Sequence, residues 1–447
     1  MSGTVTNEYF LQELPYQRDS AGLLSRLAAL SGLVFLDSGL GDPHYHQNVR
    51  HDIFSALPDL QIIEEAGAVR IIAANSASLF AGDIFAAVDA ALQRQRPTDA
   101  RIPEPIAHLP FKGGAIGCFG YERQSRIGIY SWAIIVDHQL AKTLLFALPN
   151  CPFATLQRVL RSLQTVPDTP LPFSLDQAFT ANFTAATYKT AFDRIQDYIH
   201  AGDCYQVNLA QRFSSRYEGS PLSAYLQLRQ HIHSPFAAYL QREDGAVLSF
   251  SPERFLAVGD GKALTQPIKG TRPRSTDAVL DRRMADELLT SDKDRAENLM
   301  IVDLLRNDLG SLCATGSVQV DQLFTLQSFS NVHHLVSSIS GTLGAEHSPL
   351  DLLRNCFPGG SITGAPKHRA MQIIEELEPD GRAVYCGAIV YVGFDGRMDS
   401  NITIRTLLCD APDILCWGGG GIVADSVWSA EYQECFDKIN NIIKELE

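Results

Sequence analysis

A lysine in a turn-forming segment is the residue of this sequence best suited to chemistry. Lys269 follows Pro267 and precedes Gly270, residue types that end a strand and turn the chain. A lysine amine becomes a nucleophile only when burial or a nearby cation lowers its pKa, and Arg272 and Arg274 are close in the sequence. The alternative is an exposed lysine in a basic turn, because most lysines are exposed. A chemical role for Lys269 therefore depends on its partners elsewhere in the chain.

Two acidic pairs have a spacing that presents carboxylates on one side of a helix. Asp294 and Glu297 begin a helix on which Glu297 shares the apolar face, and a carboxylate aimed at a packed interior needs a cation. A favourable position in the helix dipole is the alternative for this pair. Glu431 and Glu434 lie near the C-terminus, where Glu434 and Lys438 also fit a solvated face. Together the two pairs predict hard oxygen ligands for Mg²⁺ on both sides of a cleft.

Two glycine-rich segments offer close approach to backbone N–H groups. Residues 357–367 end in a proline suited to a first helical turn, and residues 418–421 are four consecutive glycines. Each segment is either a tight turn or part of a cavity that binds an anion.

Four single residues are further candidates. Arg405 alternates with apolar residues in a predicted strand and could bind a carboxylate in bidentate fashion, with Tyr391 on another strand. Glu253 ends a strand and could donate a proton, whereas a lone strand histidine such as His334 is more often structural than catalytic.

The elements that must position these residues alternate between strands and helices. Periodicity predicts a helix from the cap Thr184 to Gly202 and helices over 295–305, 366–377 and 429–446. Strands are predicted over 132–136, 205–212, 247–250, 388–392 and 402–408. Short turns join several strands and no Gly-x-Gly-x-x-Gly follows a first strand, which favours an α/β protein of the α+β type with large, mainly antiparallel sheets.

Composition limits the class of partner. The 447 residues carry a formal net charge of −14, which argues against nucleic acid and anionic membranes as main partners. The sequence shows no signal peptide and no apolar run of membrane-spanning length. Nine scattered cysteines without a Cys-x-x-Cys pair fit neither a disulfide framework nor a zinc site, so we expect a cytoplasmic protein. A proline-rich seam divides the chain into 1–165, a linker 166–183, and 184–447.

Several long motifs resemble those of the chorismate-utilising enzymes, and within them the aminodeoxychorismate synthase component I branch. The resemblance is continuous from about residue 184 to 446 and weaker before it. It rests on residues 202–211, 251–254, 267–271, 295–304, 358–367 and 431–434.

This resemblance implies a fold and a set of roles. The chorismate-binding fold is a sandwich of large antiparallel sheets flanked by helices, with a tryptophan-binding region near the N-terminus. The catalytic residues would be Lys269 and Glu253, and the Mg²⁺ ligands Glu297, Glu434, Asp294 and Glu431. Substrate would be held by Gln206, Thr271, His334, Gly360, Ser361, Thr363, Tyr391, Arg405, Gly419, Gly420 and Lys438. Ser38, Arg50, Pro235 and Phe236 loosely match the tryptophan pocket.

The implied reaction adds ammonia to chorismate through a covalent adduct of Lys269. Related anthranilate and isochorismate synthases carry a small residue at that position, and water-adding relatives have a lysine where this chain has Gln206. A separate glutaminase subunit would supply the ammonia in a heterodimer, and L-tryptophan is a further candidate ligand. Relatives have a longer loop where this chain has residues 121–130. An anthranilate synthase component and a non-catalytic module that binds chorismate or tryptophan are the alternatives.

Overall fold

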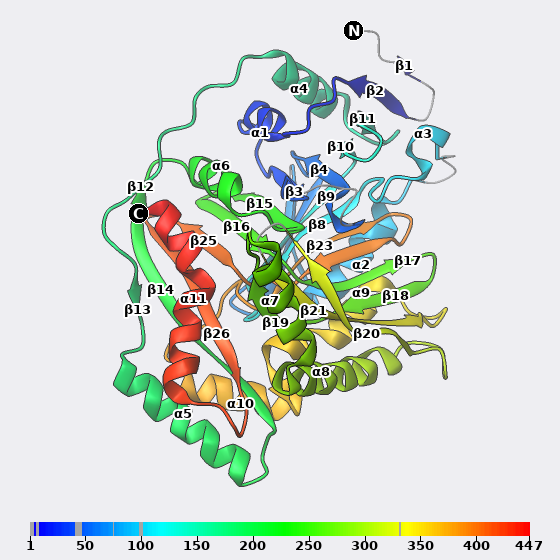
Figure 1. Cartoon of the computed structure of the whole chain (residues 1–447). Helices are drawn as coiled ribbons and strands as arrows, with labels where there is room; N and C mark the ends of the chain where they lie inside the picture. Colours follow the sequence, from blue (N-terminus) through cyan, green and yellow to red (C-terminus); the bar gives the residue numbers. More distant parts are fainter. Residues whose placement is uncertain (1–3, 6–8, 41–46, 75, 98–101, 330–331) are drawn as a thin grey trace.

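Two antiparallel β-sheets stacked face to face, with helices on their outer surfaces, form the protein (Figure 1). The computed structural model describes residues 4–5, 9–40, 47–74, 76–97, 102–329 and 332–447. This architecture confirms the predicted α+β class with large, mainly antiparallel sheets.

The larger sheet has 14 strands within the described residues, in the order β1-β2-β11-β10-β4-β3-β15-β16-β25-β26-β14-β12, with β13 and β22 also paired to β14. Its strands are β1 (Thr4–Val5), β2 (Phe10–Leu14), β3 (Val34–Asp37), β4 (His51–Ser55), β10 (Trp132–Asp137), β11 (Lys142–Ala147), β12 (Ser174–Leu175), β13 (Thr180–Ala181), β14 (Gln206–Glu218), β15 (Phe236–Arg242), β16 (Gly245–Ser251), β22 (Gly364–Ala365), β25 (Thr406–Asp410) and β26 (Asp413–Ile422).

The second sheet has 12 strands within the described residues, in the order β19-β21-β18-β17-β24-β23-β8-β9-β5-β6-β7, with β20 also paired to β21. Its strands are β5 (Leu60–Glu65), β6 (Ala68–Ala73), β7 (Ser76–Phe80), β8 (Gly114–Phe119), β9 (Ser125–Tyr130), β17 (Arg254–Gly259), β18 (Lys262–Gln266), β19 (Ile268–Pro273), β20 (Gln319–Ser328), β21 (Val332–Thr342), β23 (Ala388–Gly393) and β24 (Met398–Asn401).

Helices cover the outer faces of both sheets. They are α1 (Ala21–Leu27), α2 (Ile84–Gln95), α3 (Glu104–Ala107), α4 (Phe153–Gln164), α5 (Ala185–His200), α6 (Pro221–His231), α7 (Ala278–Thr290), α8 (Asp292–Gly310), α9 (Pro349–Cys356), α10 (Lys367–Leu377) and α11 (Trp428–Leu446), with short 3₁₀ turns at Gln47–Val49 and Gly360–Ile362. The largest core fills the space between the sheets, and two further apolar clusters lie under α1, α6 and α11 and under α5 and α10. None of the described helices is long and apolar enough to cross a membrane.

The predicted division of the chain at residues 166–183 does not coincide with a division between cores. Strand β3 pairs with β15, and β8 pairs with β23, so both sheets contain strands from either side of the seam. The segment predicted as a linker itself adds β12 and β13 to the larger sheet. Residues 1–165 and 184–447 therefore share one set of sheets.

The predicted helices are present, and one predicted strand is wrong. Thr184 caps α5 as expected, with its side chain accepting a hydrogen bond from the backbone of Thr187. The strand predicted over 402–408 begins only at Thr406, because Arg405 has a left-handed backbone with φ of 51°. A non-glycine residue with this conformation cannot continue a strand.

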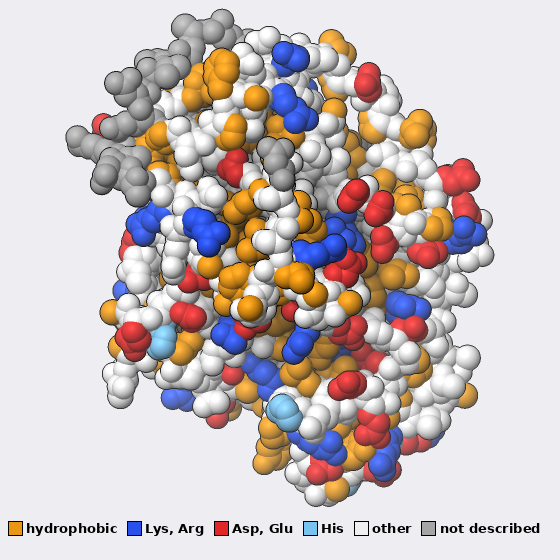
Figure 2. Space-filling view, turned by 180° about the vertical axis from the view of Figure 1, so that it is seen from behind, with side chains coloured by type: hydrophobic (Ala, Val, Ile, Leu, Met, Phe, Trp, Pro, Cys, Tyr) orange, Lys and Arg blue, Asp and Glu red, His pale blue; other side chains and the backbone are white. Residues whose placement is uncertain are grey.

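One face of the molecule carries a mixture of charges. In Figure 2, Lys and Arg side chains alternate with Asp and Glu around the periphery, and hydrophobic side chains gather toward the middle.

Candidate active site

A cavity of about 890 Å³ brings most of the predicted site residues together. Its walls come from β19, β21, β26, α8, α11 and the loop before β22. The predicted residues that line it are Glu253, Lys269, Thr271, Asp294, Glu297, His334, Ser361, Arg405, Gly419, Glu431, Glu434 and Lys438. They come from segments far apart in the sequence, so the fold and not local spacing assembles the cavity.

Ser361 connects the two predicted catalytic residues. Its hydroxyl donates a 2.9 Å hydrogen bond to Oε1 of Glu253, and its carbonyl oxygen accepts one of 3.3 Å from Nζ of Lys269. No carboxylate among the described residues forms an ion pair with Lys269. The amine is therefore held by a neutral acceptor next to a buried carboxyl group.

Burial moves the pKa values of both groups in the direction that covalent catalysis requires. Desolvation lowers the pKa of Lys269, although Glu297 and Glu253 oppose that shift. Desolvation also raises the pKa of Glu253, which is only 5% exposed, although Lys269 and the Ser361 hydrogen bond oppose it. Lys269 is thus biased toward the neutral amine, and Glu253 toward the protonated acid.

Gly270 lets strand β19 pass close to helix α8. Its φ is 79°, and a Cβ atom there would lie 2.9 Å from Cγ of Asp294. The predicted turn is instead a bulge inside β19, where the pairing with β21 shifts register between Ile268 and Thr271. Lys269 and Asp294 line the same cavity.

Carboxylates from α8 and α11 face one another across the cavity. A Cβ atom on Gly420 would lie 2.8 Å from an oxygen of Glu431 and 3.4 Å from one of Glu434, so both acids point at the same stretch of β26. Burial, followed by the nearby charges of Asp294 and Glu434, raises the pKa of Glu297 against the pull of neighbouring lysines. Glu431 is only 4% exposed, and its pKa is likewise raised by burial. Nearby cations therefore do not fully compensate the charged forms of Glu297 and Glu431.

Basic side chains partly neutralise the acids. Lys438 lies 2.7 Å from Glu434, Lys293 lies 3.9 Å from Glu297, and Arg272 lies 3.2 Å from Asp294. Among the described residues, no three His, Cys, Asp or Glu side chains are gathered into a ready-made metal site. The donors are nevertheless all hard oxygens, which suits an ion such as Mg²⁺ that retains water ligands.

Arg405 is the cation best placed to bind an anion. It lines the cavity, and its guanidinium makes no hydrogen bond or ion pair with another described residue. Burial lowers its pKa, with Glu253 as the opposing charge. Together with its left-handed backbone, this is an unpaired cation held in an unfavourable conformation, as is typical of functional sites.

His334 is fixed by neighbours on the same sheet. Its Nδ1 lies 2.9 Å from the Thr271 hydroxyl, and its ring contacts Phe329 edge to face. The prediction left open whether this histidine is structural or functional. Its ring is buried, and it still lines the cavity.

Tyr391 is the clearest correction to the predicted site. It lies on β23 and lines a different cavity together with Arg254 and Phe236. The tyrosine that lines the Lys269 cavity is Tyr385, which stacks on Trp417 with ring centroids 5.9 Å apart.

Four other predicted residues lie behind the cavity wall. Gly360 packs against Leu304, and the Thr363 hydroxyl donates to the carbonyl of Gly359. Gly420 backs onto the α11 carboxylates. The Gln206 amide lies behind Gly421, and neither of its polar atoms has a partner.

Three of the four residues predicted for tryptophan line the second cavity, of about 180 Å³. These are Arg50, Pro235 and Phe236. Ser38 does not line it, because its backbone N–H and hydroxyl both donate to Asp52. Arg50 is itself bound to Asp137 at 2.7 Å.

The sequence reasoning missed several residues that line the catalytic cavity. Tyr385 and Trp417 lie beside the glycine run, and Lys293 precedes Glu297 by one helical turn. The i,i+4 spacing of Lys293 and Glu297 could have identified Lys293 from the sequence. Within residues 121–130, where a shorter loop than in relatives was expected, residues 125–130 form β9, and Glu122 in the turn before it accepts a hydrogen bond from the Arg382 backbone N–H.

Comparison with known protein families matches residues 55–444 to the chorismate binding enzymes. The chain belongs to this family. It is 44% identical to "Aminodeoxychorismate synthase component 1" of Klebsiella aerogenes, covering 97% of this chain and 98% of that protein. It is 42% identical to "Anthranilate synthase component 1" of Aquifex aeolicus, covering 60% of this chain and 54% of that protein.

The solved structures agree with this membership. Anthranilate synthase component I from Streptococcus pneumoniae superimposes with a TM-score of 0.77 at 29% identity, covering 88% of this chain and 92% of that one. The sequence-based resemblance to the chorismate-utilising enzymes is confirmed.

Proposed function

We propose that this chain is the aminating component of an aminodeoxychorismate synthase. It would convert chorismate and ammonia to 4-amino-4-deoxychorismate, a precursor of 4-aminobenzoate and folate. The observation that carries the proposal is the buried Lys269 amine, which shares a cavity with the protonation-prone Glu253 and is held by Ser361 rather than by a carboxylate. Similarity to relatives of that name over nearly the whole chain supports the proposal.

The first step forms a covalent adduct. Neutral Nζ of Lys269 bonds to ring carbon C2, both ring double bonds shift (C1=C2 to C1=C6 and C5=C6 to C4=C5), and the C4–oxygen bond breaks. Glu253 gives its proton to the departing hydroxyl, which leaves as water. The directions of both pKa shifts favour the protonation states that this step consumes.

The second step reverses the shift with a new nucleophile. Ammonia bonds to C4, both double bonds return to their original positions, and the C2–nitrogen bond breaks to release Lys269 as a neutral amine. Glu253 takes the surplus proton from the new ammonium group and is ready for another cycle. The net reaction replaces a hydroxyl by an amine with release of water and leaves the enolpyruvyl group in place.

Charge in the cavity determines how a dicarboxylate substrate would lie. Glu297 and Glu434 would hold Mg²⁺, with Asp294 and Glu431 close by, and the ion would neutralise the ring carboxylate. Arg405, Tyr385 and the backbone of Gly418–Gly421 would receive the enolpyruvyl carboxylate at the other end. Lys438 and Lys293 must then release the glutamates that they contact without metal.

Substitution of the amine tests the covalent route. Lys269→Ala should abolish formation of aminodeoxychorismate from chorismate, Mg²⁺ and ammonium, with product identified by mass spectrometry. Lys262→Ala, at an exposed position on the same sheet, is the matched control and should retain activity. Undiminished amination by the Lys269→Ala protein would overturn the proposal.

The same assay separates the alternatives. An anthranilate synthase would release pyruvate, which a lactate dehydrogenase coupling would detect, whereas the proposed reaction releases none. A non-catalytic binding module would leave chorismate unchanged.

Two partners follow from the proposed reaction. Ammonia would come from a glutaminase component bound as a heterodimer, as the words "component 1" in the names of relatives suggest. The cavity at Arg50, Pro235 and Phe236 is proposed to bind L-tryptophan. Glutamine-dependent activity with an added glutaminase, and calorimetric titration with L-tryptophan, would test the two proposals separately.

A further inference from the structure

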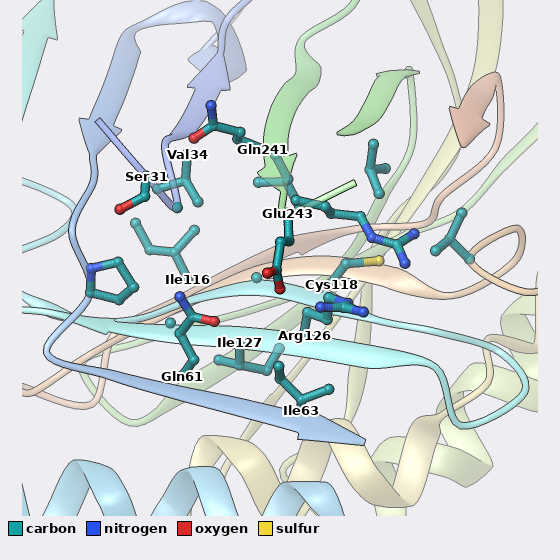
Figure 3. A pocket seen from close by; sticks show the side chains of 18 of the residues that line it. Ser31, Val34, Gln61, Ile63, Ile116, Cys118, Arg126, Ile127, Gln241 and Glu243 are labelled. Carbon is teal, nitrogen blue, oxygen red and sulfur yellow. The ribbon is translucent and has the colours of Figure 1, made fainter. Parts of the chain in front are cut away.

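A third cavity, of about 700 Å³, lies between the two sheets in the N-terminal half (Figure 3). Strands β3, β15 and β16 of the larger sheet face β5, β8 and β9 of the smaller one across it. No residue that lines it belongs to the catalytic cavity or to the Arg50 cavity. It is therefore a separate space that the proposed reaction does not use.

Two arginines face this cavity without partners. Arg126 on β9 and Arg242 at the end of β15 are half-buried, and neither guanidinium forms an ion pair or hydrogen bond with another described residue. In Figure 3, the Arg126 side chain lies beside Cys118. Burial, and then the charge of Arg126, lowers the pKa of Arg242. The charges of Asp410 and Glu65 oppose this shift, although neither carboxylate forms an ion pair with the two arginines.

Apolar side chains form part of the cavity lining, beside the polar and charged ones. Strand pairing places Cys118 opposite Arg126, and Ile63 also pairs with Arg126 from the other side. The Tyr130 side chain packs directly against Gly128, where a Cβ atom would lie 2.5 Å from its hydroxyl. Further apolar lining residues are Ala29, Val34, Pro58, Ile116, Ile127, Leu240, Val247 and Val384.

Acids at the rim restrict the charge of a ligand. Glu243 points into the space between the strands in Figure 3, and Glu64, Glu65 and Asp410 also line the cavity. These carboxylates repel anions of high charge, whereas a single carboxylate can still reach the two guanidinium groups. Charge and shape together favour one negative group on an apolar body.

We propose that this cavity binds a small monocarboxylate with an aromatic or branched apolar body. The carboxylate is bound by Arg126 and Arg242, and the body occupies the space lined by Ile63, Ile116 and Leu240. The inference is independent of the reaction proposed above, because it uses none of its residues.

Calorimetric titration with benzoate tests the proposal in a background that removes binding at the catalytic cavity. The full-length Arg405→Gln protein is titrated with benzoate, with benzylamine as a cation of the same shape, and with inorganic phosphate. Benzoate should bind, and benzylamine and phosphate should bind at least about tenfold more weakly. Equal affinity for benzoate and benzylamine, or no binding of benzoate, would overturn the proposal.

Two further variants locate the site. Adding Arg126→Gln and Arg242→Gln should weaken benzoate binding at least about tenfold. The control Arg123→Gln changes an exposed arginine three residues from Arg126 and should leave binding unchanged. An unchanged dissociation constant in the variant lacking both arginines would contradict the assignment.

Hydrogen exchange of the unsubstituted protein supplies a test that does not depend on the folding of the variants. Benzoate should slow exchange of backbone amides in residues 114–130, which form β8 and β9. Slowing confined to residues 262–273, beside Lys269, would place benzoate in the catalytic cavity alone and would also overturn the proposal.

Discussion

Two regions of the protein that contain buried or half-buried charges differ in whether those charges are paired. Near the N-terminus, Asp37 accepts from Arg229 at 2.6 Å and from the Tyr225 hydroxyl at 2.7 Å. In the catalytic cavity, Lys269 has only a carbonyl oxygen and Arg405 has no described partner. The paired charges near the N-terminus satisfy one another inside the fold. The unpaired charges in the catalytic cavity are unfavourable without a ligand, and a ligand that pairs with them removes this cost.

Removing the catalytic acid should produce the largest effect. Glu253→Gln keeps the shape and the Ser361 contact but removes the proton donor, so we expect kcat/KM for amination to fall about 10²–10⁴-fold. The free energy of unfolding should stay the same or rise, because a buried carboxyl group is costly. Steady-state kinetics and urea unfolding measure the two quantities. Glu346→Gln, at an exposed position, is the control, and a large loss of stability in Glu253→Gln would break the comparison.

Removing a carboxylate from the paired region near the N-terminus should instead lower the free energy of unfolding. Asp37→Asn leaves the buried Arg229 with only the exposed Asp19 as an ionised partner and should cost up to about 3–5 kcal/mol of unfolding free energy. Glu65→Gln breaks the exposed pair with Arg70 and should cost about 0–1 kcal/mol. If the two variants lost equal amounts of unfolding free energy, the buried pair would contribute no more to stability than the exposed pair.

The pH dependence of catalysis sharpens the comparison. The reactive form needs neutral Lys269 and protonated Glu253, so kcat/KM should fall at low pH as Lys269 gains its proton and at high pH as Glu253 loses its own. The acid limit is the pKa of Lys269, which is lowered, and the alkaline limit is the pKa of Glu253, which is raised, so the two pKa values move toward each other. In Glu253→Gln the profile should instead rise with pH as Lys269 loses its proton. A bell-shaped profile in that variant would assign the alkaline limb to another group.

The smallest expected effect concerns stability against pH in the N-terminal network. Although burial opposes both shifts, contact between the two groups lowers the pKa of Asp52 to about 2 and raises that of His138. The contribution of Asp52 is present above its unfolded pKa of ~4 and is lost as pH falls through its folded value. That of His138 is present below its unfolded pKa of ~6.5 and is lost as pH rises through its raised folded value.

Measured unfolding free energies should therefore gain most from this pair between about pH 4 and 6.5. His138→Gln should flatten that dependence. An unchanged pH profile in the variant would mean that the pair does not couple folding to protonation.

The sequence predicted those parts of the fold that depend on local spacing. The Thr184 cap, α8 and α11 all follow from periodicity and capping residues. Periodicity carries no information about which distant strands pair. The presence of strands from both 1–165 and 184–447 in each sheet could therefore not be predicted. A family resemblance, rather than spacing, supplied most of the roles proposed for the site.

The errors in the predicted site have local physical causes. Arg405 looked like a strand residue because its neighbours are apolar, but a left-handed backbone cannot be inferred from alternation. Tyr385 precedes β23, so strand alternation does not indicate where its ring points, and Tyr391 on the strand was chosen instead. Glu434 lies off the apolar stripe of α11, and its half-exposed side chain lines the cavity.

The sharing of both sheets by the two chain segments has a consequence for how the molecule comes apart. Val166 and Leu171 are exposed in the stretch between α4 and α5, so a protease has access there. A single cut would leave two fragments held by the ladders β3–β15 and β8–β23, and they should migrate as one particle until denatured. Either fragment made alone would expose unpaired strand edges and should aggregate.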